Sequence, residues 1–176
     1  METQNKFHEV VVQMTKNVER PSFYCRDAKE AVENLGEFIS NFDREYLVVI
    51  NCDSQLRPIN YNVVSIGDAT TAIAHPREIL KSAVLSNAYA MIMMHNHVNK
   101  DVEPSKEDIK ITNRMIKVCN LINIPLLDHV IVTRDLEFFS FRENDKLKHR
   151  EFYCSEYLDD VHFIKPTRKS DKLSES

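Results

Sequence analysis

The stretch that decides the fold is AYAMIMMHNHVNKDVEPSKED, residues 88–108. Its apolar part, Ala88–Met94, has the length and composition of a buried strand and ends in His95-Asn96-His97. Because side chains alternate between the two faces of a strand, both imidazoles point the same way and Asn96 points the other way. The stretch therefore predicts a strand that delivers two histidines to one place.

A helix is expected to begin shortly after this strand. Ser105 is a favourable N-cap residue, which places Asp108 in the first turn of the helix. Ser105 and Asp108 also have the spacing of a capping box, so a purely structural role is the alternative interpretation of this pair. Apolar side chains follow at helical spacing, at Ile109, Ile111, Met115, Ile116 and Cys119.

The combined motif, H-x-H-x7-S-x-x-D, offers two imidazoles and one carboxylate. This ligand set suits Zn²⁺, and three protein ligands leave a fourth tetrahedral position for water, as in catalytic zinc sites. Such water is a nucleophile near neutral pH, and the Ser105 hydroxyl could hydrogen-bond the oxyanion that forms when a carbonyl is attacked. We therefore predict one zinc ion per chain, held by His95, His97 and Asp108.

Residues 74–133, from AHPREILK to LLDHVIVT, resemble the RadC-like branch of the JAB/MPN (JAMM) metalloprotease-like domains, and the likeness extends through FFSFREN. It covers residues from about 22 to 145. The resemblance implies that His95, His97 and Asp108 bind zinc and that Ser105 assists the oxyanion. It also implies a general acid/base glutamate at the start of an early apolar strand, and Glu45 is the matching position.

A carboxylate in that role has a chemical rationale of its own. Water that attacks an amide must pass a proton to the leaving nitrogen, and a carboxylate can carry it. The residues alone leave Asp101 and Glu103 as further candidates for this role, and Asp43 is the nearest competitor of Glu45. The structural alternative for Glu45 is a solvated charge beside a buried strand.

The chain departs from the family pattern in one loop. Val98-Asn99-Lys100 stands where RadC-like proteins usually have Pro-Ser-Gly, so the loop loses a fixed φ and a permissive glycine while the ligand spacing is unchanged. Full-length RadC proteins also carry a helix-hairpin-helix module before the metal domain, for which we expect no room here.

Strand-like and helix-like segments alternate along the chain. The fold class expected from them is α/β, a single domain with a mixed sheet flanked by helices, and the resemblance implies the three-layer JAB/MPN arrangement, which is similar to that of cytidine deaminases. We divide the chain into a 1–21 extension, a 22–145 metal domain and a 146–176 extension whose last dozen or so residues are disordered. Besides the segments above, we expect strands at Glu9–Met14, Tyr46–Asn51, Asn60–Ser65, Asp128–Thr133 and Phe138–Phe141, and helices over Arg26–Phe42 and from Pro76.

Composition narrows the function classes. The 176 residues are 43% apolar, enough for one buried core, and no apolar run reaches the length of a membrane span. The net charge of −4 gives no general attraction to nucleic acid, and we expect the basic clusters at 146–150 and 165–172 to be solvated surface. Only two glycines occur, Gly36 and Gly67, which excludes glycine-rich phosphate loops.

The cysteines indicate a reducing, cytoplasmic location. They lie at positions 25, 52, 119 and 154, outside any C-x-x-C pattern, and no apolar signal segment is present, so we expect no disulfides. Cys52 and Cys119 fall within apolar patterns and are expected in the core.

The remaining histidines are secondary candidates. Asp128-His129 could support a metal histidine, because ligating imidazoles usually donate their other N–H to a partner, although we favour a structural role for the pair. His75, His149 and His162 have no partner at ligand spacing and are expected to be surface or capping residues.

Two functional hypotheses follow. The first is a zinc hydrolase that cleaves an amide or isopeptide in a peptide or protein substrate. The second is a non-catalytic or weakly active metal-binding module, associated with DNA processing only through the RadC family name. A zinc nucleobase deaminase is excluded because it would need H-x-E and P-C-x-x-C, and the contiguous His-Asn-His does not match the dispersed residues of HNH nucleases.

Overall fold

The computed structural model describes residues 14, 23–67, 75–98 and 101–147. The expected strand Glu9–Met14 lies outside these ranges except for its last residue, and residues 148–176 lie outside them entirely. The described helices and strands are α1 (Ala28–Ser40), β1 (Tyr46–Cys52), β2 (Pro58–Ile66), α2 (Pro76–Leu85), β3 (Ala90–His97), α3 (Lys106–Leu121), β4 (Leu126–Thr133) and β5 (Phe138–Ser140).

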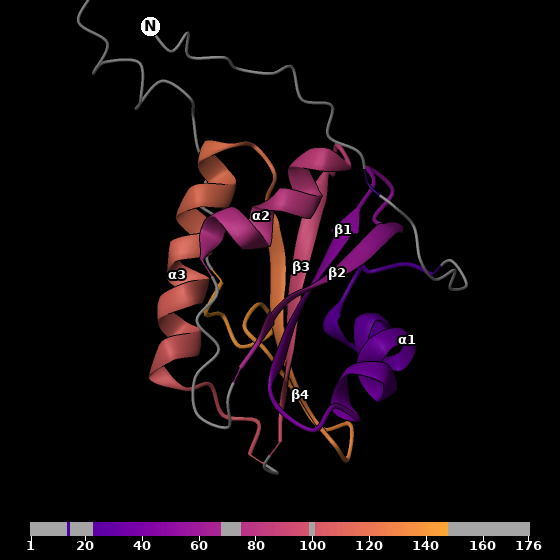
Figure 1. The fold of residues 1–176 in the computed structure, drawn as a ribbon, viewed down its shortest axis with the longest axis vertical. Coiled ribbons are helices and arrows are strands. Elements are labelled where there is room, and N and C mark those ends of the chain that lie inside the picture. Colours follow the sequence, from indigo (N-terminus) through magenta and orange to yellow (C-terminus); the bar gives the residue numbers. More distant parts are fainter. Residues whose placement is uncertain (1–13, 15–22, 68–74, 99–100, 148–176) are drawn as a thin grey trace, which may run out of the picture.

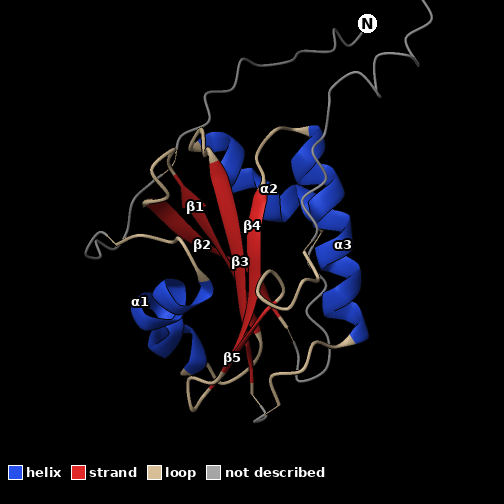
Figure 2. Ribbon diagram, turned by 180° about the vertical axis from the view of Figure 1, so that it is seen from behind, coloured by secondary structure: helices blue, strands red, loops and turns tan. Residues whose placement is uncertain are grey.

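The five strands form one mixed sheet in the order β2-β1-β3-β4-β5. β1 and β2 form an antiparallel hairpin, β1 pairs antiparallel with β3, and β4 pairs antiparallel with β5. The β3–β4 pair is parallel, with α3 as the crossover between its strands. Helix α1 covers one face of the sheet, and α2 and α3 cover the other (Figures 1 and 2). The expected three-layer α/β fold is confirmed.

The core consists of two clusters, one on each face of the sheet. Apolar residues of α1 pack against even-numbered positions of the central strands, such as Val48 and Met94. Residues of α2 and α3 pack against odd-numbered positions, such as Val49 and Met93. The alternation of a β-strand produces this division, and it decides which side chains of β3 face α3.

Two helices differ in detail from the expectation. Helix α1 begins at Ala28 rather than Arg26, because the Asp27 side chain caps it by accepting a hydrogen bond from the Glu30 N–H at 2.8 Å. On α3, Ile109 was expected on the buried face but is 40% exposed, whereas Thr112 is 1% exposed. The buried stripe of α3 therefore contains a polar residue, which matters for the site described below.

Strand β3 lies at the centre of the sheet, and all eight of its residues are buried. It carries the two motif histidines on its odd-numbered face, toward α3, and Asn96 on the other side. The predicted strand is confirmed with shifted bounds: β3 begins at Ala90 rather than Ala88 and continues through His97, where it still pairs with β4.

Cys52 and Cys119 are buried with free thiols, as expected, and Cys25 is buried and free as well, whereas Cys154 lies outside the described residues. Burial raises the pKa of Cys119 to about 12, so its thiol stays protonated. Within the described ranges, none of the helices combines the length and apolar character needed to cross a bilayer.

Candidate metal centre

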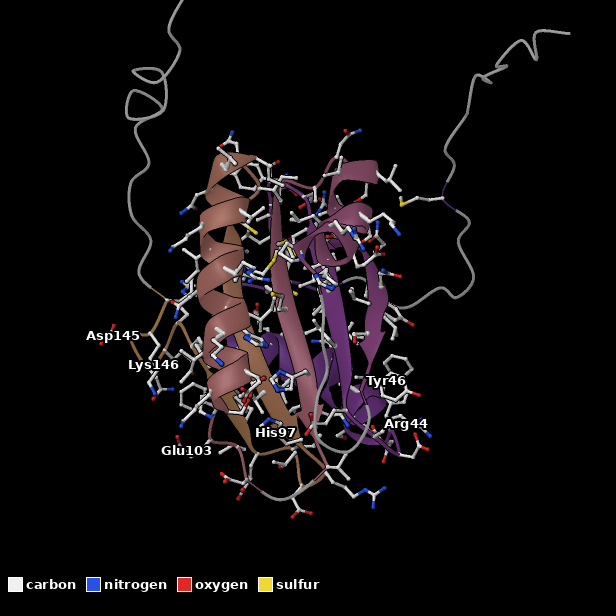
Figure 3. The ribbon with its side chains drawn as sticks, turned by 60° about the vertical axis from the view of Figure 1, so that its left-hand side comes forward. Arg44, Tyr46, His97, Glu103, Asp145 and Lys146 are labelled. Carbon is white, nitrogen blue, oxygen red and sulfur yellow. The ribbon has the colours of Figure 1, made fainter. Side chains whose placement is uncertain are left out.

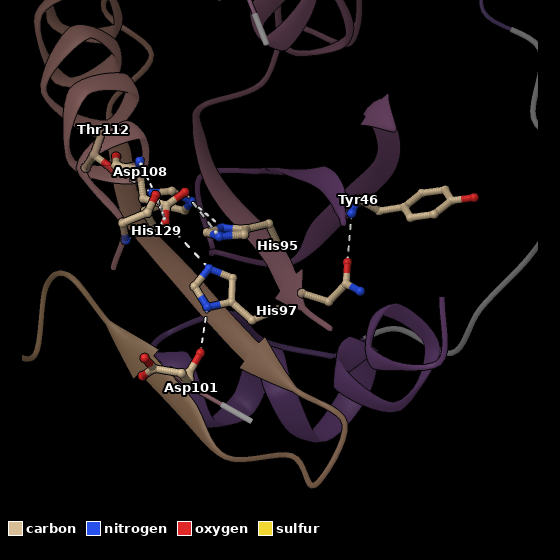
Figure 4. A network of polar contacts seen from close by, with 9 residues as sticks. Tyr46, His95, His97, Asp101, Asp108, Thr112 and His129 are labelled. Carbon is tan, nitrogen blue, oxygen red and sulfur yellow. Dashed lines mark hydrogen bonds and ion pairs between the residues drawn. The ribbon is translucent and has the colours of Figure 1, made fainter. Parts of the chain in front are cut away.

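The three predicted ligands come together at one end of the sheet. One potential ligand atom from each of His95, His97 and Asp108 lies within 4.8 Å of the others. Nε2 of His95 is 3.2 Å from Oδ1 of Asp108, and Nε2 of His97 is 3.5 Å from Oδ2 (Figure 4). All three side chains are largely shielded from solvent. The residues that the sequence motif predicts therefore share one small space.

The capping box of α3 fixes Asp108. Ser105 is the N-cap, its Oγ accepts the Asp108 N–H at 3.1 Å, and its own N–H donates to Oδ2 of Asp108 at 2.8 Å. The Ser105 hydroxyl also donates to Oδ2 at 2.6 Å. The structural interpretation of the Ser105/Asp108 pair is thus confirmed, and it places the carboxylate against the two imidazoles.

The tautomer of His97 follows from its partner. Nδ1 of His97 lies 2.6 Å from the main-chain carbonyl oxygen of Asp101, which can only accept a hydrogen bond. Nδ1 therefore carries the proton, and in the neutral ring Nε2 keeps a free lone pair. That lone pair belongs to the atom nearest Asp108.

The tautomer of His95 is set by a longer chain of hydrogen bonds, here called the Thr112 relay, which consists of Thr112, His129 and His95 (Figure 4). The Thr112 hydroxyl donates to the Asp108 main-chain carbonyl at 2.6 Å, so it must accept from Nδ1–H of His129, also at 2.6 Å. Nε2 of His129 then accepts from Nδ1–H of His95 at 2.9 Å. The relay leaves the Nε2 lone pair of His95 free.

This lone pair is the observation that best fits a metal ion. Nε2 of His95 is buried and has no hydrogen-bond partner among the described residues, because its 3.2 Å approach to Asp108 lacks hydrogen-bond geometry. An unpartnered buried nitrogen is costly unless something occupies its lone pair. Two imidazole lone pairs and a carboxylate that face one another form a donor set suited to a divalent cation.

The electrostatics of the site agree with this donor set. Burial opposes ionisation of Asp108, but contacts with His95, His97 and Ser105 outweigh it and hold the pKa of Asp108 well below its usual value. Burial alone would lower the pKa of His97, yet the net shift is upward because the Asp108 carboxylate, the Asp101 carbonyl and the charge of Glu45 favour the protonated ring. Burial, and then the neighbouring His95, keep the pKa of His129 low, so that ring is neutral as the relay requires.

Glu45 lies on the same face of the sheet as the ligands. Leu47 is paired with His95 at the end of the β1–β3 register, and Glu45 lies two residues before Leu47, the spacing that puts side chains of an extended segment on one face. The effect of the Glu45 charge on the pKa of His97 agrees with this placement. The Glu45 side chain is half-buried. The position therefore brings a carboxylate within electrostatic reach of His97.

The competing carboxylates are placed differently. Asp43 is exposed and paired with Arg44, and Asp101 and Glu103 are exposed on the loop before α3. The Asp101 carboxylate accepts the Glu103 N–H at 2.9 Å, and only its main-chain carbonyl contacts His97. Figure 3 shows that Arg44, His97 and Glu103 occupy the same end of the molecule. The competing carboxylates therefore differ from Glu45 in burial rather than in the end of the molecule at which they lie.

The two residues of the Asp128-His129 pair make different contacts, and those of His129 fit the alternative role, support of a candidate metal histidine, better than the structural role that we favoured. The Asp128 carboxylate is structural, since it accepts hydrogen bonds from the Ser140 hydroxyl and the main-chain N–H of Arg142. His129 instead contacts the candidate ligand His95 directly, with His129 Nε2 2.9 Å from His95 Nδ1. Sequence reasoning did not identify Thr112, although its place one turn after Asp108 on the buried side of α3 was a usable signal.

The remaining candidates lie away from this site or outside the description. His75 is exposed at the N-cap of α2, as expected, although its side chain makes no capping hydrogen bond. His149 and His162 lie outside the described residues, as do Asn99 and Lys100 of the loop that departs from the family pattern.

Comparisons with known proteins agree with this geometry. The sequence model of the family described as the RadC-like JAB domain matches residues 25–147. The chain is 35% identical to a UPF0758 protein of Chlorobaculum parvum over 136 residues, 77% of this chain and 60% of the relative. It is 39% identical to a UPF0758 protein of Clostridium tetani over 126 residues, 72% of this chain and 55% of the relative. For a UPF0758 protein of Thermotoga maritima, the identity is 39% over 105 residues, 60% of this chain and 47% of the relative.

The chain thus spans about half to three-fifths of the length of these curated relatives. The family match includes every residue of the candidate metal centre, and the motif spacing from His95 to Asp108 lies wholly within it. On the matched sequence, the three-layer sheet and the convergent histidines and aspartate, the chain belongs to the RadC-like JAB domain family.

Proposed function

We propose that this protein is a zinc-dependent hydrolase that cleaves an amide or isopeptide bond in a peptide or protein. The observation that carries the proposal is the convergence of two free Nε2 lone pairs with the Asp108 carboxylate, beside a half-buried Glu45 on the same face. Three ligands rather than four are typical of catalytic zinc. A bound zinc ion would polarise the substrate carbonyl and lower the pKa of water at its fourth position.

The residues of the chain supply the proton chemistry. Glu45 accepts a proton from the attacking water as the new C–O bond forms, and it returns that proton to the leaving nitrogen as the C–N bond breaks. His95 and His97 would hold the ion through Nε2, since the Nδ1 proton of each is committed to a neighbour. Shielding of the ligands from solvent strengthens each of these electrostatic interactions.

The Ser105 hydroxyl has a more constrained role. Its proton is directed to Oδ2 of Asp108 at 2.6 Å, so it can serve an oxyanion only by giving up that bond. Its role as an oxyanion donor stays a prediction, secondary to its hold on Asp108.

The test compares zinc-loaded wild type with Glu45→Gln on a fluorogenic peptide mixture and on a peptide joined through a lysine isopeptide. We expect Glu45→Gln to bind one zinc ion per chain and to lose turnover by roughly 10²–10⁴-fold. Glu103→Gln and Asp43→Asn are matched controls, since both neutralise an exposed carboxylate near the site and should keep turnover. Wild-type turnover in Glu45→Gln would refute the proton role. Zinc-loaded wild type that cleaves neither probe would favour the non-catalytic module.

A further inference from the structure

The residue between the two ligands, Asn96, is completely buried and makes two hydrogen bonds with the main chain of a neighbouring strand. Its Oδ1 accepts the N–H of Tyr46 at 2.8 Å, and its Nδ2 donates to the carbonyl of Arg44 at 2.9 Å (Figure 4 shows the bond to Tyr46). Arg44 and Tyr46 are the residues immediately before and after Glu45. One side-chain amide therefore holds both peptide units that flank Glu45.

The main chain of Glu45 is fixed on its other side as well. Its carbonyl accepts the N–H of Gly67 at 2.8 Å, at the far end of the β1–β2 hairpin. The regular β1–β3 pairing begins at Leu47, so the Asn96 amide takes the place that a main-chain ladder would occupy beyond that point. Two hydrogen bonds from Asn96 on β3 and one from Gly67, just after β2, thus hold the main chain around Glu45 from both sides.

We propose that Asn96 is a positioning residue that aims the Glu45 carboxylate at the metal centre. His95, Asn96 and His97 are consecutive on one strand, so the two histidines and the amide that holds the main chain around Glu45 keep fixed positions relative to one another. The inference rests on the proposed function, because the position of Glu45 matters for catalysis only if Glu45 transfers a proton from water to the leaving nitrogen. The general warrant is that a shift of about 1 Å in a reacting group, caused from outside the chemistry, can cost on the order of 100-fold in rate.

The first arm of the test measures position rather than activity. Glutamate side-chain carboxyls are labelled with ¹³C, and the NMR signal of Glu45 is assigned as the one that disappears in Glu45→Gln. The signal is then observed in protein loaded with Co²⁺, whose unpaired electrons shift and relax nearby nuclei. We expect Asn96→Leu, which is similar in size but makes neither hydrogen bond, to weaken the paramagnetic effect on Glu45 while Co²⁺ affinity stays within about threefold. An unchanged effect on Glu45 would overturn the proposal, whatever the activity data show.

The second arm measures turnover on the same peptide and isopeptide probes. Asn96→Leu should lower kcat by roughly 10–100-fold with KM unchanged. Combined with Glu45→Gln it should cause no further loss, because Asn96 acts through Glu45. An additional loss in the double variant would show that Asn96 acts by another route. If Glu45→Gln keeps full turnover, the proton role of Glu45 fails, and if wild type cleaves neither probe, the proposed function fails; in both cases the cobalt experiment still decides whether Asn96 positions the carboxylate.

Asn51 provides the matched control. It is also an asparagine with no exposed surface, lies on β1, and makes side-chain hydrogen bonds to Asn60 at 2.6 Å and Ser82 at 3.0 Å. Asn51→Leu should destabilise the fold to a comparable degree and leave the Glu45 signal unchanged. If Asn96→Leu does not fold, Asn96→Asp keeps the acceptor for the Tyr46 N–H and loses the donor to Arg44, and it should displace the Glu45 signal. A Glu45 signal that stays in place in Asn96→Asp would then overturn the proposal.

Discussion

At the scale of single residues, metal affinity depends on side chains that do not themselves offer a ligand to the site. Thr112 and His129 set the tautomer of His95 through the relay that ends at the Asp108 carbonyl. Without the Thr112 hydroxyl, Nδ1–H of His129 loses its acceptor. The ring is then free to carry its proton on Nε2, facing the Nδ1 proton of His95.

We therefore expect Thr112→Val and His129→Phe each to weaken zinc binding by roughly 10–100-fold while the fold is kept. Phenylalanine preserves the stacking of residue 129 on Phe141, whose rings now lie 5.0 Å apart. Competition with a chromophoric chelator measures the zinc affinity. Cys119→Ala is the control, since Cys119 is buried on the same helix outside the relay and its loss should leave the affinity unchanged. Wild-type affinity in Thr112→Val would contradict the relay.

Asp128 gives the metal-free protein a specific pH dependence. Burial raises the pKa of this carboxyl, although Ser140 and the main-chain N–H groups of Arg142 and His129 oppose the shift. In the unfolded chain the group titrates near 3.9. Between about pH 4 and its raised pKa, the folded state binds more protons than the unfolded state, so its contribution to stability decreases as pH rises.

Asp128→Asn removes this titration while it preserves the shape of the side chain. We expect the difference in unfolding free energy between Asp128→Asn and wild type to move in favour of the variant from about pH 4 upward, by at most about 1.4 kcal/mol per pH unit for one proton. Urea denaturation with chelator present, repeated across this pH range, measures the difference. A difference that stays constant with pH would mean that Asp128 titrates alike in both states.

At the scale of elements, the start of α3 joins helix stability to ligand placement. Ser105→Ala should lower the unfolding free energy by about 1 kcal/mol through loss of the cap, and it should also weaken zinc binding because Oδ2 of Asp108 loses the hydroxyl bond. Ser105→Thr keeps a hydroxyl and should retain most of both properties. Calorimetry of the metal-free and zinc-loaded variants separates the two effects. A stability loss with unchanged affinity would confine Ser105 to capping.

Local sequence patterns predicted most helices and strands because capping and turn preferences depend on neighbouring residues, whatever the rest of the fold. Ser105 was recognised as an N-cap and Pro76 as a helix start, and both positions are confirmed. The start of α1 was placed early because Asp27, a good capping residue, was included in the helix. Ile109 was assigned to the core by its apolar character, whereas tertiary packing turns Thr112 inward to meet His129.

At the scale of the whole molecule, a metal ion at this site would link the sheet to a helix. Two ligands lie on β3 and the third on α3, and the unfolded chain has no preformed site. Free zinc at 100 times its Kd should therefore raise the unfolding free energy by about 2.7 kcal/mol, and a chelator should reverse the gain. Thermal unfolding of wild type and His97→Gln measures it. An equal gain in His97→Gln would place the bound zinc elsewhere.

The alternation of strands and helices was enough to predict the layers, but not that Glu45 would come within electrostatic reach of His97. That encounter depends on the pairing of β1 with β3, whose paired residues Leu47 and His95 are 48 positions apart in sequence. A sequence motif records spacing along the chain, so the three ligands between positions 95 and 108 were recognisable. Glu45 was identified through family resemblance, because no local pattern records which strands become neighbours.

Both ends of the Thr112 relay meet Asp108. Thr112 donates to the main chain of Asp108, and the nitrogen that the relay leaves free on His95 faces the side chain of Asp108. The residues of the relay come from β3, α3 and β4, so the loss of any one of these elements breaks the chain of hydrogen bonds. A protein engineer who transplants the three ligands alone onto a new scaffold would leave behind the hydrogen bonds that fix the tautomer of His95. The smallest transferable unit is the strand–helix–strand segment as a whole.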